Sequence, residues 1–309
     1  TRKLGGIGGR GLPRESLFVL EVDFMTLFSL ALVLTAAVCH ATWNTLVKRV
    51  NGGPELVWLF SVIAALLYVP VAIWILLVDQ PVLGPREIVF CIVSALLHLG
   101  YFLLLQQGYR QGDLSLVYPT ARATGPLLST AFAVVILGEH LTLPIFLGGL
   151  AIIVGVVFLT GGFKSKSRHV TSSLAFGLAA GTLIGTYTVW DAYTLRALLI
   201  PPLLLEYASI LLRVIALAPF AALRKDEIRR QWSEHRAAVL GIAIFNPLAY
   251  ILVLIALVFT PVVYVAPARE VSVLITVMIG TLLLKEGDFT KRMGWASLIL
   301  AGMVLLALS

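Results

Sequence analysis

Residues 25–47 read MTLFSLALVLTAAVCHATWNTLV, without a single Lys, Arg, Asp or Glu. A helix of about 20 apolar residues crosses the ~30 Å hydrocarbon core of a bilayer, so this stretch is long enough to span it. Two polar side chains near its end, His40 and Asn44, are four residues apart and share one helical face, with Trp43 beside that face. Because polar groups inside a span usually face a protein interior, the stretch predicts a transmembrane helix that borders a polar interior.

Comparable apolar runs recur along the whole chain of 309 residues, of which 59% are hydrophobic and 13% charged. A soluble domain of this size could not keep so large an apolar fraction out of water. Only the segments 161–173 and 224–236 are long enough to be loops. We therefore predict an all-α membrane protein with ten transmembrane helices and no soluble domain. The predicted spans are Phe24–Val47, Leu56–Val78, Ile88–Tyr109, Leu114–Leu137, Leu143–Thr160, Leu174–Leu195, Ile200–Leu223, Ala237–Val258, Pro261–Leu284 and Met293–Leu308.

The two halves of the chain resemble each other at an offset of 147 residues. The landmarks that share this offset are HATWN at 40–44 with YTVWD at 187–191, Ala121-Arg122 with Ala268-Arg269, Glu139 with Glu286, and Gly155 with Gly302. Because five spans end on the opposite side of the membrane, the second copy must be inverted, and inverted repeats around a midplane site are a recurring transporter architecture. We predict a first five-helix repeat at 25–162, a connecting loop at 163–171 and a second, inverted repeat at 172–309, around a central cavity. Residues 1–24, rich in glycine and basic residues, are expected to be a disordered or non-native tail.

Basic residues are distributed unequally between the two predicted faces. The face that bears the termini carries Arg2, Lys3, Arg10, Arg14, Arg86 and Arg196. The opposite face carries Lys48, Arg49, Arg110, Lys164, Lys166, Arg168, Arg224, Lys225, Arg229, Arg230, Arg236, Lys285, Lys291 and Arg292. Cytoplasmic loops are enriched in Lys and Arg, so both termini are predicted to lie outside the cytoplasm. The net charge of +7 therefore reflects membrane topology and not nucleic-acid binding.

Three motifs connect the chain with a known family. They are HATWN at 40–44 followed by Lys48, the Gly138-Glu139 pair after the fourth span, and Phe146-Leu-Gly-Gly-Leu-Ala at the start of the fifth span. With ten spans and a duplication, they make residues 25–309 resemble an EamA-type permease of the drug/metabolite transporter superfamily. The resemblance implies a ten-helix basket in the bacterial inner membrane, with a central cavity and alternating access. It also implies export or exchange of amino acids, other metabolites or drugs.

Polar and aromatic residues within the predicted spans form the candidate substrate site. They are His40, Trp43, Asn44, Tyr101, Tyr118, Arg122, Tyr187, Trp190, Asp191, Asn246, Tyr250, Arg269 and Glu270. Arg122 and Arg269 would bind a carboxylate or phosphate, because a guanidinium keeps its charge and donates two parallel hydrogen bonds. We expect both arginines to point into one cavity, together with Trp43 and Trp190, whose rings would supply apolar walls.

The alternative is that these groups satisfy one another as structural ion pairs. Either arginine could pair with Glu270 or Asp191, and Glu206 lies seven residues before Arg213, so this pair is nearly in line along one helix. We interpret Glu206 and Arg213 as such a structural pair. For Arg122 and Arg269, substrate binding and a structural ion pair stay as two alternatives.

The leading functional prediction is a secondary transporter, an exporter or exchanger of a small anionic or zwitterionic metabolite such as an amino acid. One alternative is a proton-coupled exporter of lipophilic cations, with Asp191 or Glu270 as the proton site. Another is a membrane-embedded enzyme that modifies lipids, although the five histidines are scattered and no catalytic or phosphate-binding motif occurs. We predict no enzyme activity, no cofactor and no metal. The predicted partners are a small-molecule substrate, the lipid bilayer, and protons or a counter-substrate, in a monomer or homodimer.

Overall fold

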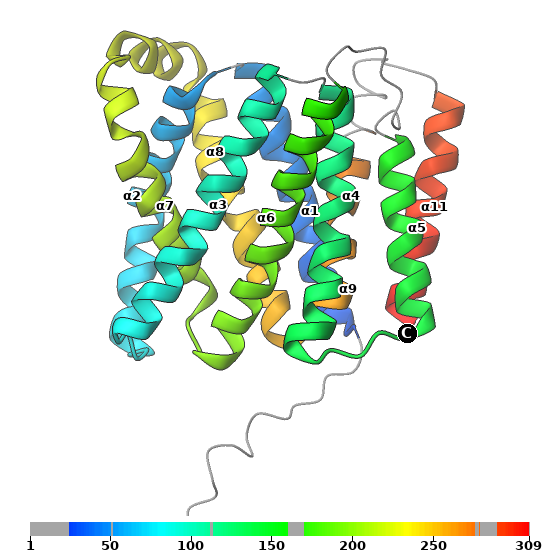
Figure 1. Cartoon of the computed structure of the whole chain (residues 1–309). Helices are drawn as coiled ribbons and strands as arrows, with labels where there is room; N and C mark the ends of the chain where they lie inside the picture. Colours follow the sequence, from blue (N-terminus) through cyan, green and yellow to red (C-terminus); the bar gives the residue numbers. More distant parts are fainter. Residues whose placement is uncertain are drawn as a thin grey trace, which may run out of the picture.

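A computed structural model describes residues 25–50, 52–111, 114–159, 170–275, 278 and 289–308. Over these residues the regular secondary structure is helical, as the predicted all-α class requires, and the helices stand side by side as an upright bundle (Figure 1). The elements are α1 (Leu27–Val50), α2 (Pro54–Val78), α3 (Pro85–Gln111), α4 (Leu114–Phe132), the π-helical turn η2 (Ala133–Leu137), α5 (Leu143–Leu159), α6 (Val170–Ala197), α7 (Pro202–Ala222), α8 (Lys225–Phe259), α9 (Val262–Ala268) and α11 (Phe289–Leu308).

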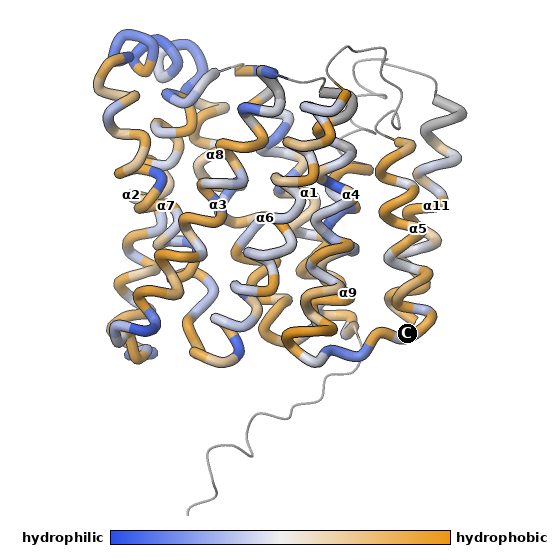
Figure 2. Tube along the Cα trace, in the orientation of Figure 1, coloured by the Kyte–Doolittle hydropathy of each residue, from blue (hydrophilic) through white to orange (hydrophobic). Residues whose placement is uncertain are grey.

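Seven helices of the described chain are long and apolar enough to cross a membrane: α1, α2, α3, α4 continued by η2, α6, α7 and α8. Two shorter apolar helices, α5 and the 293–308 part of α11, lie beside them. Apolar residues predominate along the middle of the bundle, and hydrophilic residues gather at its ends (Figure 2). The chain is therefore a multi-pass membrane protein, and the full count of ten spans stays a prediction.

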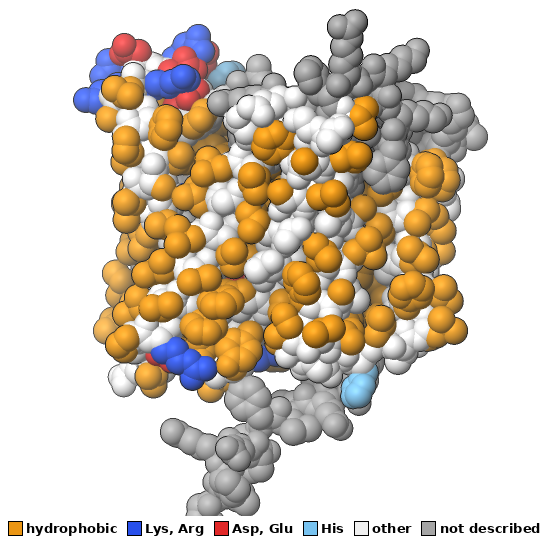
Figure 3. All heavy atoms as spheres, in the orientation of Figure 1, with side chains coloured by type: hydrophobic (Ala, Val, Ile, Leu, Met, Phe, Trp, Pro, Cys, Tyr) orange, Lys and Arg blue, Asp and Glu red, His pale blue; other side chains and the backbone are white. Residues whose placement is uncertain are grey.

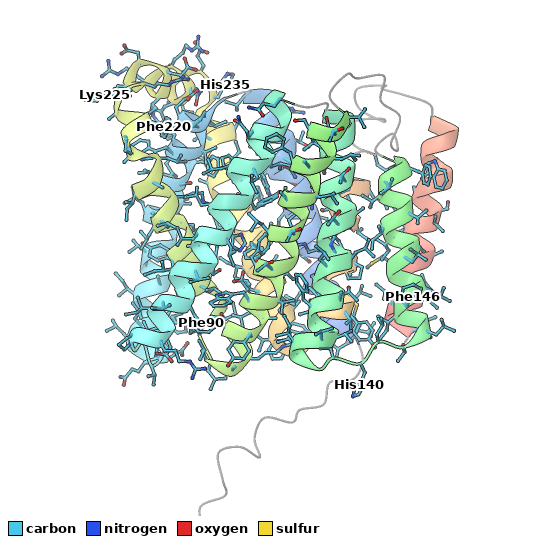
Figure 4. All side chains as sticks on the ribbon, viewed as in Figure 1. Phe90, His140, Phe146, Phe220, Lys225 and His235 are labelled. Carbon is cyan, nitrogen blue, oxygen red and sulfur yellow. The ribbon has the colours of Figure 1, made fainter. Side chains whose placement is uncertain are left out.

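The segment 224–236, predicted as a loop, is largely helical. α8 begins at Lys225, and its only non-helical backbone within the helix is at His235, with φ −129° and ψ 25°. The predicted eighth span therefore follows a kink, and a short charged helical segment at 225–234 precedes it. Asp226 and Glu227 in the first turn favour this segment, because carboxylates stabilise the positive end of a helix dipole. Lys225 and His235 lie at the same outer end of the bundle (Figure 4).

The predicted ninth span, Pro261–Leu284, is interrupted within the described chain. α9 ends before Arg269 and Glu270, which form a turn, and helix resumes over 271–275. The amide of Glu270 donates to the Pro267 carbonyl at 3.0 Å, a tighter spacing than in an α-helix. Non-helical backbone at membrane depth occurs only where protein buries it or where it lines a cavity. The break therefore marks an interior position. Residues 276–277 and 279–288, which include the end of the predicted span and Glu286, lie outside the described part.

Helices from the two halves of the chain pack against each other. α1 packs on α8, α3 and α4 on α6, α2 on α7, and α5 on α11. The last contact is so close that a Cβ added at Gly302 would lie 2.6 Å from the carbonyl oxygen of Gly148, so glycine is needed at this crossing. α1 and α6 run in opposite directions, and the start of α1 lies at the same end of the bundle as the end of α11 (Figure 1).

Candidate functional site

A cavity of about 370 Å³ lies within the bundle, bordered by α1, α2, α3, α4, α6, α7, α8 and the turn after α9. Its lining extends from Ala36 in the middle of α1 to Gly52 at the junction with α2, so the cavity reaches the end of the bundle where these helices meet. Its polar and aromatic lining includes ten of the predicted site residues: His40, Trp43, Asn44, Tyr101, Tyr118, Arg122, Tyr187, Asn246, Tyr250 and Arg269.

On one wall, α4 brings Arg122 to Glu270 in the turn after α9. Nη1 of Arg122 lies 3.2 Å and 3.3 Å from the two carboxylate oxygens, and Glu270 is only 1% exposed. Nη2 of the same guanidinium lies 3.2 Å from Nε2 of His40, whose Nδ1 is 3.3 Å from the indole nitrogen of Trp43. A neutral imidazole has one acceptor nitrogen, so His40 accepts from one of these two donors at a time. The buried pair Arg122–Glu270 is thus charge-compensated.

The second arginine, Arg269, has neutral hydrogen-bond partners. Its Nη2 donates to the hydroxyl of Tyr187 at 2.9 Å, and its Nη1 donates to Oγ1 of Thr188 at 3.4 Å. The Glu270 carboxylate is farther away, with 3.9 Å between Nε of Arg269 and Oε1. Within the described part of the chain, the buried Arg122 and the partly buried Arg269 therefore share one carboxylate, and the excess positive charge lies with Arg269, which lines the cavity.

Both arginines contact the ring that lies 82 residues before them in the chain. His40 contacts Arg122, and Tyr187 contacts Arg269, so the two contacts differ by the repeat offset of 147 residues. The carboxylate of Glu270 has no counterpart in the first repeat, because Ala123 occupies the corresponding position. The repeat therefore preserves the ring–arginine contact but not the charge balance.

A separate polar cluster surrounds Asp191 on α6, which has no exposed surface. Its carboxylate accepts from Oγ of Ser94 at 2.5 Å and from the hydroxyl of Tyr250 at 2.6 Å, and it lies 3.0 Å from Nε2 of His98. The His98 side chain is 20% exposed, lines the cavity and stacks on Tyr187 with 3.9 Å between ring centroids. His98 thus connects a buried carboxylate with the cavity.

A third charged group, Glu206 and Arg213 on α7, also lines the cavity. Nη2 of Arg213 lies 3.1 Å from Oε1 of Glu206, and its Nη1 lies 3.3 Å from the side-chain oxygen of Asn246 on α8. These distances agree with the ion pair predicted from the sequence. The pair compensates its own charge within the cavity wall.

Three of the predicted site residues lie outside the lining. Asp191 and Glu270 are buried behind it, each within hydrogen-bonding distance of lining residues. Trp190 departs from the expectation that it faces the cavity with Trp43: its indole donates to the Phe90 carbonyl at 3.0 Å and stacks on the Phe90 ring at 4.3 Å. The packing of α6 on α3 holds Trp190 on the side away from the cavity.

Sequence reasoning left other lining residues out of the site, notably His98, Glu206 and Arg213. The position of His98 three residues before Tyr101, on one face of the third span, was a usable signal. Glu206 and Arg213 were recognised as a pair, but nothing in their spacing indicates that the pair borders the cavity.

The Gly138-Glu139 motif has a structural position of its own. Gly138 ends η2 in the left-handed conformation, with φ 69°, which glycine adopts without strain. The Glu139 carboxylate accepts from the amides of Val262 and Val263 at the start of α9, at 2.8 Å and 3.0 Å, and from Arg196 at 2.8 Å. The motif therefore fixes the start of α9, and α9 in turn positions the turn that carries Arg269.

Comparisons with known proteins bear on both the fold and the function. A solved protein described only as "Crystal structure of protein" is similar over 91% of this chain and 96% of its own, with 16% sequence identity and a TM-score of 0.71. At that identity the likeness shows the fold alone. No curated protein matches the sequence significantly. The model of the EamA-like transporter family matches twice, over residues 27–161 and 171–308. The resemblance seen in the sequence is thereby confirmed, and the chain, with its two repeats, belongs to the EamA-like transporter family of membrane transporters.

Proposed function

We propose that the chain is a secondary transporter that exports or exchanges a small anionic or zwitterionic metabolite, such as an amino acid, by alternating access. The observation that carries this proposal is the set of neutral hydrogen-bond partners of Arg269 in the cavity. Among the described residues, its hydrogen-bond partners within 3.4 Å are neutral, and the nearest carboxylate, Glu270, is already held by Arg122. A substrate carboxylate would complete this charge balance with charge-assisted hydrogen bonds, which are stronger than neutral ones.

The part of the cavity that adjoins Arg269 through Tyr187 and His98 favours a zwitterion over a simple anion. Asp191 holds a negative charge close to the lining through His98 and Tyr250, and the Glu206 carboxylate is part of the lining itself. The negative charge of these groups would attract an ammonium group while the carboxylate of the same molecule bound Arg269. The aromatic rings of the lining would contact the rest of the substrate.

Alternating access rests on the two repeats, which we propose to be inverted five-helix units. α1 and α6 begin the two repeats and run in opposite directions (Figure 1). In the two repeats α6 corresponds to α1, and α8 corresponds to α3. Two symmetric units should therefore pack α1 on α8 and also α6 on α3, and both contacts are present. In such a pair of units, swapping conformations opens a central site first to one side and then to the other.

The cavity reaches the end of the bundle that bears Arg49 and the basic residues of 224–236. Figure 3 shows a group of charged side chains at this end. By the positive-inside rule we propose that this end is cytoplasmic and that both termini are outside, in a bacterial inner membrane. For coupling, the His98–Asp191 contact is a candidate proton site beside the substrate, and exchange against a second solute is the alternative.

The export of lipophilic cations has less support from this geometry. That function needs a membrane carboxylate that binds either a proton or the drug. The carboxylate of Glu270 lies between two arginines, and that of Glu206 is paired with Arg213. Membership of a transporter family likewise favours a carrier over a lipid-modifying enzyme.

The test is counterflow in liposomes that contain the purified protein, screened with labelled amino acids, phosphorylated metabolites and cationic dyes. We expect uptake of an anionic or zwitterionic solute, and a roughly tenfold or greater loss of affinity in Arg269→Gln, as charge-assisted hydrogen bonds contribute about 1.5–3 kcal/mol. Arg86→Gln, an exposed arginine remote from the cavity lining, is the matched control and should behave as wild type. Counterflow of cationic dyes alone would overturn the proposal.

A further inference from the structure

A second hollow lies on the outer surface of the bundle, between α2 and the charged helical segment that opens α8. Its volume is about 410 Å³, and it is separate from the substrate cavity. It is lined by Leu59, Ile63, Lys225, Ile228, Arg229 and Trp232. We refer to these six residues as the α2–α8 groove.

The α8 side of the groove is one face of a helix. Lys225 and Arg229 are four residues apart, as are Ile228 and Trp232, so all four side chains project from the same side. Ile228 packs, with Ile63 of α2, against a buried apolar cluster, whereas Lys225 and Arg229 are exposed. The groove therefore has an apolar floor and a cationic rim.

The two cations of the rim lack acidic partners among the residues that the structure describes. Their neighbour Arg230 differs, because it pairs with Glu227 at 2.7 Å. Lys225 projects at the outer end of the bundle (Figure 4), where charged side chains gather above the apolar surface (Figure 3). The rim thus carries two exposed cations without an ion-pair partner in the described chain, at the end of the bundle where the apolar surface gives way to charged side chains.

We propose that the α2–α8 groove binds an anionic phospholipid. Its phosphate would lie between Lys225 and Arg229, and an acyl chain would lie over Leu59 and Ile63. Charge complementarity selects an anionic headgroup, because basic side chains at a membrane surface attract anionic lipids. Trp232, 40% exposed at the same level, is of the residue type that anchors proteins at the membrane interface.

The course of α2 explains why the ligand is a lipid and not a free phosphate. Beyond Ile63 the same helix presents exposed apolar side chains as far as its last turns, with Leu66 68%, Ile73 50% and Trp74 60% exposed. A single acyl chain could follow this surface from the groove into the hydrocarbon core. A soluble phosphate would leave the apolar floor uncovered.

The bound lipid would also hold the segment of α8 that borders the cavity entrance. Gln231, on the other side of the segment, is 4% exposed, and its amide nitrogen would be 2.9 Å from a Cβ added at Gly52. Gly52 lines the substrate cavity. The groove and the entrance thus lie on two sides of one helical segment, so a lipid that binds the folded protein should raise its melting temperature.

The experiment uses the full chain in mild detergent, incubated with phosphatidylglycerol or with phosphatidylcholine of the same acyl chains. Native mass spectrometry measures the lipid retained, and a thermal scan measures stabilisation. We expect retention of phosphatidylglycerol over phosphatidylcholine and a higher melting temperature with the former. Lys225→Gln/Arg229→Gln should lower retention roughly tenfold or more, since each basic residue near an anionic surface contributes about fivefold. Arg236→Gln, an exposed arginine of the same end outside the groove, is the matched control.

Three results would overturn the proposal. The first is unchanged retention in the double variant. The second is an equal loss in Arg236→Gln, which would mean that the whole basic end attracts the lipid without a site. The third is displacement of the lipid by millimolar glycerol phosphate, which would identify a headgroup site without a role for the acyl chain. None of these readouts depends on the transported substrate, so the proposed function and the lipid site can fail separately.

Discussion

Arg122 and Arg269 occupy equivalent positions in the two repeats, yet their guanidiniums have different partners. Arg122 contacts both oxygens of the buried Glu270, whereas Arg269 donates to two neutral hydroxyls and lies farther from that carboxylate. The cause is one divergent position, since the first repeat has Ala123 where the second has Glu270. Each repeat carries one arginine, and this divergence gives Arg122 a buried ionic partner and leaves Arg269 with neutral hydrogen-bond partners, which is the basis of the ligand-binding role proposed for Arg269.

A second divergent pair shows the same effect on the first helix of each repeat. Asn44 lines the cavity, whereas its equivalent, Asp191, is buried in a cluster with Ser94, His98 and Tyr250. The negative charge beside the cavity therefore comes from one repeat alone. The charged groups around the cavity are therefore not repeated symmetrically, which would suit the unsymmetrical substrate that we propose.

The largest expected effect is that of Glu270→Gln, which removes the one carboxylate shared by the two arginines. Breaking a buried ion pair and stranding its partner costs about 3–5 kcal/mol. We expect a large fall in melting temperature in detergent. Glu227→Gln is the control, because its pair with Arg230 is solvent-exposed and such pairs contribute little. Equal melting temperatures for the two variants would contradict the assignment of Glu270.

The comparison of the two arginines predicts opposite phenotypes for the same substitution. Arg122→Gln should lower the melting temperature more, because it leaves the Glu270 carboxylate without its closest cation. Arg269→Gln should lower substrate affinity more, by roughly tenfold or more, with a smaller thermal effect. Melting curves and counterflow affinities of both variants check this. Indistinguishable profiles would mean that the arginines act as one unit.

A smaller effect is expected for Tyr250→Phe, which removes one hydrogen bond to the Asp191 carboxylate. Hydrogen bonds to charged groups contribute about 1.5–3 kcal/mol, and neutral ones about 1 kcal/mol. Tyr207→Phe is the matched control, since the Tyr207 hydroxyl donates to the neutral carbonyl of Ala65 at 3.2 Å. Thermal unfolding should show the larger loss in Tyr250→Phe. The reverse order would argue against a charged Asp191.

The smallest effect is expected at Trp190, whose ring lies against Phe90 and away from the cavity. Trp190→Phe should change substrate affinity by less than about twofold, because a ring outside the lining contributes no substrate contact. Trp43→Phe, at the equivalent position in the first repeat, removes a cavity-lining indole and should have the larger effect. Counterflow affinities compare the two directly. A stronger loss in Trp190→Phe would move the substrate site toward α3.

The sequence predicted much of the site because its signals are local. Helical spacing placed His40, Trp43 and Asn44 near one interior face, and all three line the cavity. The same reasoning was wrong for the direction of Trp190, since an offset between repeats says nothing about how each helix is rotated against its neighbours. The break after α9 was missed for a related reason: Arg269-Glu270 lies within an apolar run that reads as one continuous helix.

The composition and the lengths of the apolar runs indicated a polytopic helical membrane protein, because hydrocarbon imposes its length and polarity on every span. The shared offset of 147 residues indicated two repeats and two repeat-related arginines. Only the tertiary structure distinguished the partners of those arginines. The Arg122–Glu270 contact joins residues 148 positions apart, and it exists because a turn after α9 aims Glu270 toward α4. Such a contact depends on the positions and rotations of several helices at once, and no local pattern of residues records them.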